Sequence, residues 1–235
     1  MRDMLARRPL VASLARIPFF AGLDTAALER LADGMRTRRF RRGDIIFHAG
    51  DPGDALFIIV SGEVKIAVPS ESGEEAILVT LGDGDVFGEL ALLDGAPRSA
   101  TATALVATEV VVLPREQFRE LIATEPAVRD ALLASLAGEL RRLTNHVEEL
   151  HFLDITGRLA AMLVRLSGEA GPIDANGAIR LRATLTQAEL ASMVGCTRQS
   201  VNKLLGQFSD AGLVRLDRDG IVVTDLRGLV AASHR

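Results

Sequence analysis

The residues best placed to do chemistry are an acid and an arginine, Glu89 and Arg98, which share a glycine-containing segment at residues 86–101 between two apolar stretches. A strand, a helical turn and a strand would enclose both side chains in a small β-barrel. An enclosed arginine needs an anion, and its planar guanidinium suits a phosphate. Main-chain N–H groups at Leu90 and Ala91 would donate to the same anion, and Glu89 would accept from a sugar hydroxyl. The segment therefore predicts a site for a phosphorylated nucleoside.

The alternative is a buried ion pair between Glu89 and Arg98 that holds no ligand, since such pairs are common and often add little stability. The residue order favours the ligand site. Gly-Glu-Leu-Ala-Leu at residues 88–92, followed by Pro-Arg-Ser-Ala at residues 97–100, resembles the phosphate-binding cassette of the cyclic-nucleotide-binding domain. The match continues without a gap, so it is much more specific than a short glycine motif.

This resemblance implies a role for each residue of the cassette. Arg98 holds the cyclic phosphate, and Glu89 binds the ribose 2′-hydroxyl. Gly88 and Leu90 line the wall of the pocket, and Ser99 lies beside the phosphate and the purine. The effector is then a cyclic nucleotide. We expect cAMP, with cGMP as the alternative, because the hydroxyl of Ser99 can accept from the 2-amino group of guanine.

Length and composition narrow the class of protein. The chain has 235 residues, of which 48% are hydrophobic, enough for one large domain or two smaller ones. Cys196 is the only cysteine, which excludes a disulfide framework and an iron–sulfur cluster and suits a reducing cytoplasm. The apolar runs stay below the roughly 18 residues of a membrane span. We expect a cytoplasmic protein with no metal, no cluster and no membrane partner.

Residues 42–113 consist of short apolar runs separated by glycine-rich turns. Such spacing predicts antiparallel strands in a β-barrel or jelly roll. Residues 50–65 also resemble the cyclic-nucleotide-binding family. Ile66 and Leu78 lie in two of the runs and are predicted to face the base of a bound nucleotide, with a simple core role as the alternative for each.

A long helix is predicted from about residue 127 to residue 150. Its apolar residues repeat at spacings of four and three, which is the a/d pattern of a two-stranded coiled coil. The alternative is a helix that packs on its own barrel, as amphipathic helices usually do. The residues of this predicted seam are Leu136, Leu140, Leu143, Val147 and Leu150.

The C-terminal third predicts a helix-turn-helix. Thr186 and Glu189 form a capping box that opens one helix, Gly195 provides the turn, and Thr197 caps a second helix over residues 198–208. A hairpin at residues 213–223 follows as a wing, and residues 167–177 before the motif are predicted to form a loop. The residues predicted to contact DNA are Thr197, Arg198, Gln199, Ser200, Asn202 and Lys203.

Helix-turn-helix shapes also occur in enzymes and scaffolds, so the surface of the second helix decides between these classes. Arg198, Gln199, Asn202 and Lys203 share its outer face. Arginine can read guanine, and glutamine can read adenine. Residues 155–235 carry 10 Lys and Arg against 7 Asp and Glu, which suits a polyanionic partner. DNA binding is the better interpretation, and no nucleophile–His–acid set indicates an enzyme.

The segment Phe-Leu-Asp-Ile-Thr-Gly-Arg-Leu-Ala at residues 152–160 resembles the domain junction of the Crp–Fnr family of bacterial transcription regulators. The resemblance covers nearly all of residues 18–225. It implies an α+β fold with a jelly-roll barrel over residues 1–125, a dimerisation helix and hinge over 126–153, and a winged helix-turn-helix over 154–235. It also implies a homodimer on a palindromic operator in double-stranded DNA, with RNA polymerase as a further candidate partner.

The chain departs from the family's cyclic-AMP members in two places, the recognition helix and the long helix, where Thr144 could still serve. Gln199 and Lys203 stand where a glutamate and an arginine are common, so the usual operator cannot be assumed. Leu143 and Thr144 stand where adenine-reading members have two polar residues, and Leu143 cannot form a hydrogen bond. Two alternatives therefore stay open: a regulator that binds DNA without a cyclic mononucleotide, and one that responds to cyclic di-GMP.

Overall fold

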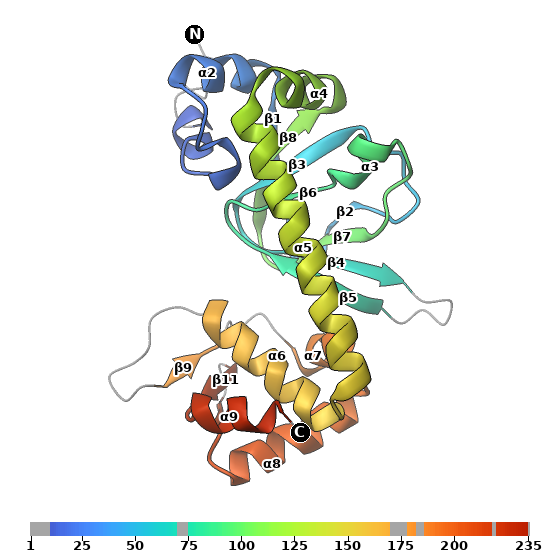
Figure 1. Cartoon of the computed structure of the whole chain (residues 1–235), viewed down its shortest axis with the longest axis vertical. Helices are drawn as coiled ribbons and strands as arrows, with labels where there is room; N and C mark the ends of the chain where they lie inside the picture. The colour runs from blue at the N-terminus through green and yellow to red at the C-terminus, as the bar shows by residue number, and fades with distance from the viewer. Residues whose placement is uncertain (1–9, 70–74, 170–177, 182–185, 218–219, 235) are drawn as a thin grey trace. The chain divides into compact units, whose positions relative to one another are not determined.

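The computed structural model describes residues 10–69, 75–169, 178–181, 186–217 and 220–234, which form two compact units (Figure 1). The first unit ends at Leu140 and the second begins at Arg141. Both residues lie within one long helix, α5 (Pro126–Phe152). The first unit contains a β-barrel with covering helices, and the second contains short helices with a small sheet.

Two four-stranded antiparallel sheets form the barrel, in the strand orders β1-β8-β3-β6 and β2-β7-β4-β5. Neighbouring strands are mostly distant in the sequence, which is the topology of a jelly roll. The predicted fold class is thereby confirmed. The strands are β1 (Arg36–Phe40), β2 (Ile45–Phe47), β3 (Ala55–Ser61), β4 (Val64–Pro69), β5 (Glu75–Leu81), β6 (Val86–Phe87), β7 (Thr101–Ala104) and β8 (Thr108–Pro114).

An inner core fills the space between the two sheets. The rings of Phe57 on β3 and Phe87 on β6 stack with their centroids 5.3 Å apart, and Phe47 on β2 lies against both. Ala102 and Ala104 on β7 belong to the same buried cluster. Large rings combined with small alanine side chains are a typical way to fill a narrow barrel.

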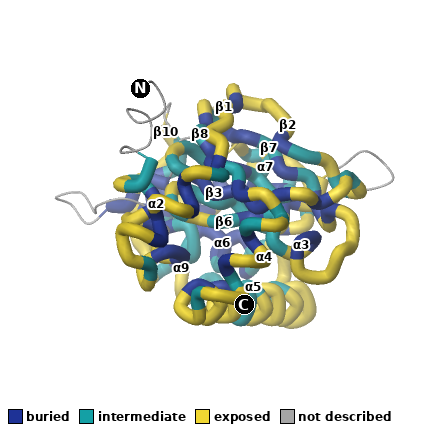
Figure 2. The backbone as a smooth tube through the Cα atoms, turned by 90° about the horizontal axis from the view of Figure 1, so that it is seen from above, coloured by how far each residue is buried: buried dark blue, intermediate teal, exposed yellow. Residues whose placement is uncertain are grey.

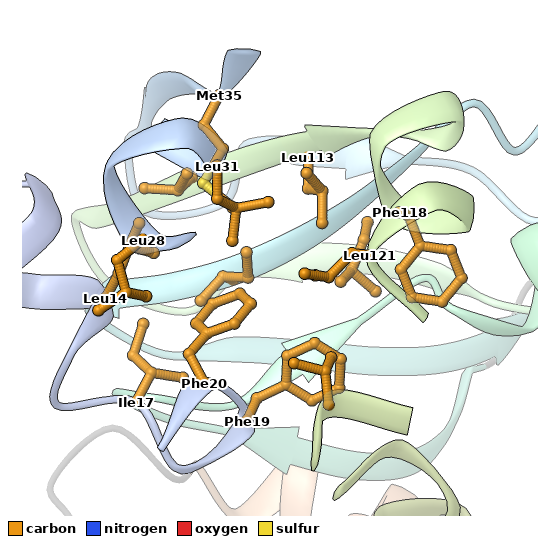
Figure 3. Close-up of a cluster of buried hydrophobic side chains, with 14 of the residues drawn as sticks. Leu14, Ile17, Phe19, Phe20, Leu28, Leu31, Met35, Leu113, Phe118 and Leu121 are labelled. Atoms are coloured by element: carbon orange, nitrogen blue, oxygen red, sulfur yellow. The ribbon is translucent and has the colours of Figure 1, made fainter. Parts of the chain in front are cut away.

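A second core covers the outer face of the β1-β8-β3-β6 sheet. Figure 3 shows the rings of Phe19, Phe20 and Phe118 among leucines from the covering helices and from β8. The covering elements are η1 (Pro18–Phe20), α2 (Thr25–Gly34), α3 (Leu90–Asp94), α4 (Arg115–Thr124) and the beginning of α5. Asp24 caps the helix α2 by accepting from the N–H of Ala27 at 2.7 Å.

The long helix α5 divides into a packed half and an uncovered half. Val128 and Leu132 are buried in the outer core, and Leu136 packs against it. Beyond them Leu140 is 66% exposed and Val147 is 55% exposed, and Figure 2 draws the coil of α5 mostly in the exposed colour. The barrel therefore covers the first residue of the predicted seam, and the later residues remain uncovered.

The second unit begins on α5 and contains a helical bundle with a three-stranded sheet of order β10-β11-β9. The predicted loop at residues 167–177 begins too early, because α6 continues through Ser167, whose hydroxyl donates to Leu163 O at 2.7 Å. Residues 170–177 lie outside the described residues. The elements are α6 (Ile155–Glu169), β9 (Ile179–Arg180), α7 (Gln187–Val194), α8 (Arg198–Asp210), β10 (Val214–Asp217), β11 (Gly220–Val223) and α9 (Leu226–Ala232).

Candidate functional site

Arg98 is a buried arginine whose hydrogen-bonding capacity is only partly used. The residue is only 4% exposed. Its side chain donates from Nη1 to Gly88 O at 2.6 Å and from Nη2 to Ala55 O at 2.7 Å. Nε is buried and has no hydrogen-bond partner among the described residues. A buried donor without a partner is costly, and a guanidinium has five N–H groups. Arg98 therefore has donors left for an anion.

The Arg98 guanidinium lies over the aromatic end of the inner core. Its Cζ is 4.4 Å from the ring centroid of Phe47 and 5.4 Å from that of Phe57, which favours the cation. Burial lowers the pKa of Arg98, and the nearby Asp54 opposes this effect. Arg98 also forms an ion pair with Asp54, in which Nη2 of the arginine lies 3.8 Å from Oδ1 of the carboxylate. The ligand-free alternative predicts an ion pair between Arg98 and Glu89. Among the described residues, Arg98 instead pairs with Asp54.

Gly88 is the residue that admits the arginine. Its φ is +84°, in the left-handed region, and a Cβ at this position would lie 2.6 Å from Nη1 of Arg98. Any other residue would be strained in the backbone and would push the guanidinium away from the Gly88 carbonyl. Gly95, with φ of 76°, then ends the short helix α3. The two glycines thus have steric reasons for their positions in the cassette.

Glu89 directly precedes α3 and is half-buried. Its main-chain carbonyl accepts from the N–H groups of Leu92 and Leu93 at 2.9 and 3.0 Å, which fixes the residue at the beginning of the helix. Burial raises the pKa of the Glu89 carboxyl, Glu139 on α5 raises it further, and Arg98 lowers it. Perturbed acids of this kind are typical of functional sites.

The neighbouring cassette residues differ in exposure. Leu90 is 45% exposed, whereas Ala91 is 2% exposed and packs into the unit. Ser99 is exposed and directly follows Arg98. Their predicted contacts with a nucleotide stay predictions.

Ile66 and Leu78 lie where two strands slip in register. Ile66 on β4 packs against the inner core and pairs with Val79, after which Ala67 pairs with Ile77. Leu78 is therefore the extra residue of a β-bulge, and it is 38% exposed. Bulges redirect side chains and are frequent beside binding sites. This geometry supports the prediction that Leu78 faces a base, which stays a prediction.

Leu143 and Thr144 lie on the part of α5 that belongs to the second unit, and both are exposed. The sequence interpretation missed Leu133, which is 57% exposed and precedes Leu140 by one heptad. The signal was present, because Leu133 continues the same spacing towards the N-terminus. It also missed Phe47 and Phe57, since no sequence pattern indicates which core rings lie under an arginine.

The helix-turn-helix of the second unit has the predicted caps. Thr186 Oγ1 accepts from Glu189 N–H at 3.2 Å, and Glu189 Oε2 accepts from Thr186 N–H at 2.7 Å. Gly195 is left-handed with φ of 71° and ends α7. Thr197 Oγ1 accepts from the N–H of Ser200 at 3.1 Å, which caps α8. Each helix of the motif is thus fixed at its first turn.

Helix α8 presents one polar face to solvent. Val201, Leu205 and Phe208 are buried, while Leu204 is only half-buried. The opposite face is formed by residues that are all exposed. These are Arg198, Gln199, Asn202 and Lys203.

The wing is the antiparallel hairpin of β10 and β11, in which Val214 pairs with Val223. Arg180 on β9 donates from Nη1 and Nη2 to the two carboxylate oxygens of Asp217 at 2.9 and 2.8 Å. This bidentate pair joins β9 to the hairpin. Residues 218 and 219 of the predicted turn lie outside the described residues.

Neither a metal cluster nor a membrane span is found in the described part of the chain. No group of three or more His, Cys, Asp or Glu residues is placed there to hold a metal ion. None of the helices described combines the length and the apolar character needed to span a bilayer. The expectation of no metal, cluster or membrane partner stays a prediction.

Both candidate sites lie in regions that match models of known protein families. The family model described as a cyclic nucleotide-binding domain matches residues 37–125. The model described as a Crp-like helix-turn-helix domain matches residues 157–232. The first match contains the buried Arg98, and the second contains α7, α8 and the wing.

Characterised relatives align over most of their length. A CRP-like cAMP-activated global transcriptional regulator of Mycobacterium tuberculosis is 38% identical over 212 residues, which cover 90% of this chain and 94% of that protein. The cyclic AMP receptor protein of Thermus thermophilus is 34% identical, over 85% and 88% of the two chains. Among solved structures, the c-di-GMP responsive global regulator CLP of Xanthomonas campestris has a TM-score of 0.75 at 26% identity, over 85% and 99%. A CRP/FNR family regulator of Thermus thermophilus has a TM-score of 0.68 at 29% identity, over 85% and 99%.

The chain therefore belongs to the Crp–Fnr family of transcription regulators. It is a ligand-responsive regulator that combines a cyclic-nucleotide-binding domain with a DNA-binding helix-turn-helix. The predicted family and function are confirmed.

Proposed function

We propose that this protein is a cytoplasmic homodimer that binds cAMP in its barrel and, in response, binds a palindromic operator. The observation that carries the effector proposal is Arg98, a buried guanidinium whose Nε has no partner among the described residues. A phosphodiester anion satisfies that donor and offsets the buried charge. RNA polymerase is a candidate partner of the DNA-bound form.

Two residues of the cassette, Arg98 and Glu89, and Leu78 of β5 contact different parts of the nucleotide. Arg98 donates to the phosphate oxygens, and the ring of Phe47 below it keeps the guanidinium in place. The ionised Glu89 accepts from the ribose 2′-hydroxyl. Leu78, at the bulge of β5, packs against the base, and its partial exposure leaves an apolar side chain available for that contact. None of these three residues distinguishes adenine from guanine.

The choice of cAMP over cGMP rests on the relatives. Proteins named as cAMP-activated regulators align over 85% or more of this chain. Ser99 is exposed beside Arg98, and its hydroxyl would also accept from guanine. Leu143 and Thr144 are the proposed contacts from the long helix, where only Thr144 can form a hydrogen bond with a base.

Cyclic di-GMP is the second candidate effector. It is favoured by one observation, the fold likeness to a regulator described as c-di-GMP responsive, at 26% identity. A ligand-independent regulator is the remaining alternative. It is disfavoured by the unpartnered Nε, since a protein without an anionic ligand gains nothing from keeping a buried donor unsatisfied.

The uncovered half of α5 supports the dimer. Leu140 and Val147 are 66% and 55% exposed in one chain, and Leu133 adds a further exposed leucine. These side chains repeat with a heptad spacing, as in a parallel two-stranded coiled coil. A dimer of this kind would place two α8 helices on half-sites roughly 34 Å apart, one turn of DNA.

One experiment tests the whole proposal. Calorimetric titration of the purified protein with cAMP, cGMP and cyclic di-GMP is combined with DNA-binding measurements with and without each ligand, on sites selected from a random pool. We expect cAMP to bind with the highest affinity and to strengthen DNA binding. By linkage, DNA must then strengthen cAMP binding by the same factor. Tight cyclic di-GMP binding without cAMP binding would replace the effector, and DNA binding that no ligand alters would remove it.

A further inference from the structure

A second arginine, Arg115, joins the same two segments that Arg98 joins. Arg115 is the first residue of α4 and is half-buried. It donates from Nε to Gly53 O at 3.2 Å and from Nη2 to both Gly53 O and Ala91 O, the latter at 3.1 Å. Its main-chain N–H donates to Asp54 O at 2.8 Å. Arg115 thus holds the loop before β3 and the middle of α3 at once.

The two arginines form parallel links. Arg98 connects Ala55 with Gly88, and Arg115 connects Gly53 with Ala91. The linked parts are residues 53–55, here called the loop segment, and residues 88–91, here called the cassette segment. The cassette segment contains Glu89. The relative position of the two segments therefore sets where Arg98 and Glu89 stand.

Steric contact makes the spacing of the two segments sensitive to small changes. Gly53 is buried, and a Cβ built on it would lie 2.3 Å from the Cβ of Ala91. The backbone of Gly53 therefore packs directly against the side chain of Ala91, with no room for a methyl group between them. Arg115 Nη2 also satisfies a carbonyl of α3, a helix too short to satisfy its own last carbonyls.

Arg115 also connects this region to the long helix. Phe118 and Leu121, on the same helix as Arg115, are buried in the outer core together with Leu132 of α5 and Leu92 of α3. A shift of the cassette segment would therefore move against residues that pack on α5. The charge of Arg115 is close enough to Arg98 to lower its pKa, after the larger effect of burial.

We propose that Arg115 is a positioning residue of the effector site: it fixes the loop segment against the cassette segment and so holds Arg98 and Glu89 in register for a cyclic phosphate, without touching the ligand. The proposal rests on the effector function above. It assigns Arg115 a part in coupling as well, because the same side chain ties the cassette to α4 and through the outer core to α5.

The test compares Arg115→Gln and Arg115→Lys with the control Arg119→Gln, which alters an exposed arginine one turn further along α4. Calorimetry with cAMP should show at least a tenfold loss of affinity for Arg115→Gln, a smaller loss for Arg115→Lys and wild-type affinity for the control. The increase in DNA affinity at saturating cAMP should also shrink for Arg115→Gln, while DNA affinity without cAMP stays unchanged. A purely structural role would not separate these two DNA measurements.

A second variant and a ligand-free readout keep the proposal open to refutation. Gly53→Ala forces the segments apart while every arginine side chain is kept, and should weaken cAMP binding as Arg115→Gln does. Hydrogen exchange of the ligand-free protein should become faster in both segments for Arg115→Gln. If wild type binds no cyclic nucleotide, the proposed function fails, while the exchange result still decides whether Arg115 holds the segments. Wild-type cAMP affinity in both variants, or unchanged exchange, would overturn the inference.

Discussion

The two candidate binding regions of this protein expose the side chains proposed for binding to opposite degrees. In the barrel, Arg98 is 4% exposed, donates hydrogen bonds to two carbonyl groups and lies over two aromatic rings. On α8, by contrast, Arg198 and Gln199 are exposed and stand on a helix whose buried face is a separate set of residues. A buried charge depends on everything around it, whereas an exposed one can be exchanged with little effect on the fold.

The comparison indicates which region can change its specificity. Replacing Arg98 or Gly88 would disturb an interlocked set of contacts, so the class of effector is tied to the architecture. Replacing Gln199 would change only what the surface of α8 reads. We therefore expect substitutions in the barrel to abolish a function and substitutions on α8 to redirect one.

The largest effect is expected for Arg98→Leu, which should abolish cAMP binding in calorimetry. The change removes the proposed hydrogen-bond donor to the phosphate and a buried charge together, and leucine can occupy the space over Phe47. Charge-assisted hydrogen bonds to a phosphate contribute on the order of 1.5–3 kcal/mol each, so losing two of them weakens binding by about 3–6 kcal/mol, a factor of roughly 10²–10⁴. Arg119→Leu, at an exposed position, is the control. A folded Arg98→Leu protein with wild-type affinity would remove Arg98 from the site.

The next effect concerns the uncovered half of α5. Leu140→Asp places a carboxylate in the proposed seam, and an uncompensated buried charge typically costs on the order of 3–5 kcal/mol. Light scattering should change from about twice the 25.1 kDa chain mass to the monomer mass. Leu216→Asp, at a 40% exposed leucine on the wing, should remain dimeric. A wild-type monomer at micromolar concentration would disprove the seam.

The same contrast explains what could be predicted from the sequence. The helix caps at Thr186 and Thr197 were predictable because they depend on residues three apart in the chain. The cassette was predictable from its resemblance to a family. The hydrogen bond from Arg115 to Gly53 joins residues that are 62 positions apart in the chain, so no local sequence pattern predicts it.

Two further differences have physical reasons. Leu136, the first residue of the predicted seam, packs against the outer core. At this turn of α5 the residues with heptad spacing lie on the same face of the amphipathic helix as the residues that face the barrel. The position of Leu78 depends on a register shift, which a strand pattern of period two does not reveal. The sequence therefore predicts the secondary-structure elements and where they begin and end. The structure shows which segments that are distant in the sequence are in contact.

A moderate effect is expected for the exposed region. Arg198→Ala should weaken binding by about 1–3 kcal/mol at a site with the matching guanine and relax the preference at one base of each half-site. The neighbouring Gln199 has no charge to attract the amino group of cytosine, so Gln199→Glu should shift the selected sites towards a C·G pair. Selection from a random DNA pool measures both changes. Identical half-sites for wild type and Gln199→Glu would show that Gln199 does not read a base.

The smallest effect concerns pH and returns to the barrel. Burial raises the pKa of the Glu89 carboxyl, and the charge of Glu139 raises it further. The ionised form is the one proposed to accept from the ribose hydroxyl. The cAMP affinity should therefore be complete above this pKa and should fall as the pH drops through it, by at most about tenfold per pH unit for a single proton. Because the pKa is raised, the decline should begin at a higher pH than for an ordinary glutamate.

Two substitutions separate this effect from acid damage to the fold. Glu89→Gln removes the titrating group, so its affinity should be lower and independent of pH over the range in which wild type declines. Glu139→Gln removes a neighbouring negative charge, so the pKa of Glu89 should fall and the decline should move to lower pH. The exposed α8 face offers the internal comparison, since DNA binding without effector should not follow the Glu89 profile. If Glu89→Gln keeps the wild-type pH dependence, another group titrates in the site and Glu89 does not hold the ribose.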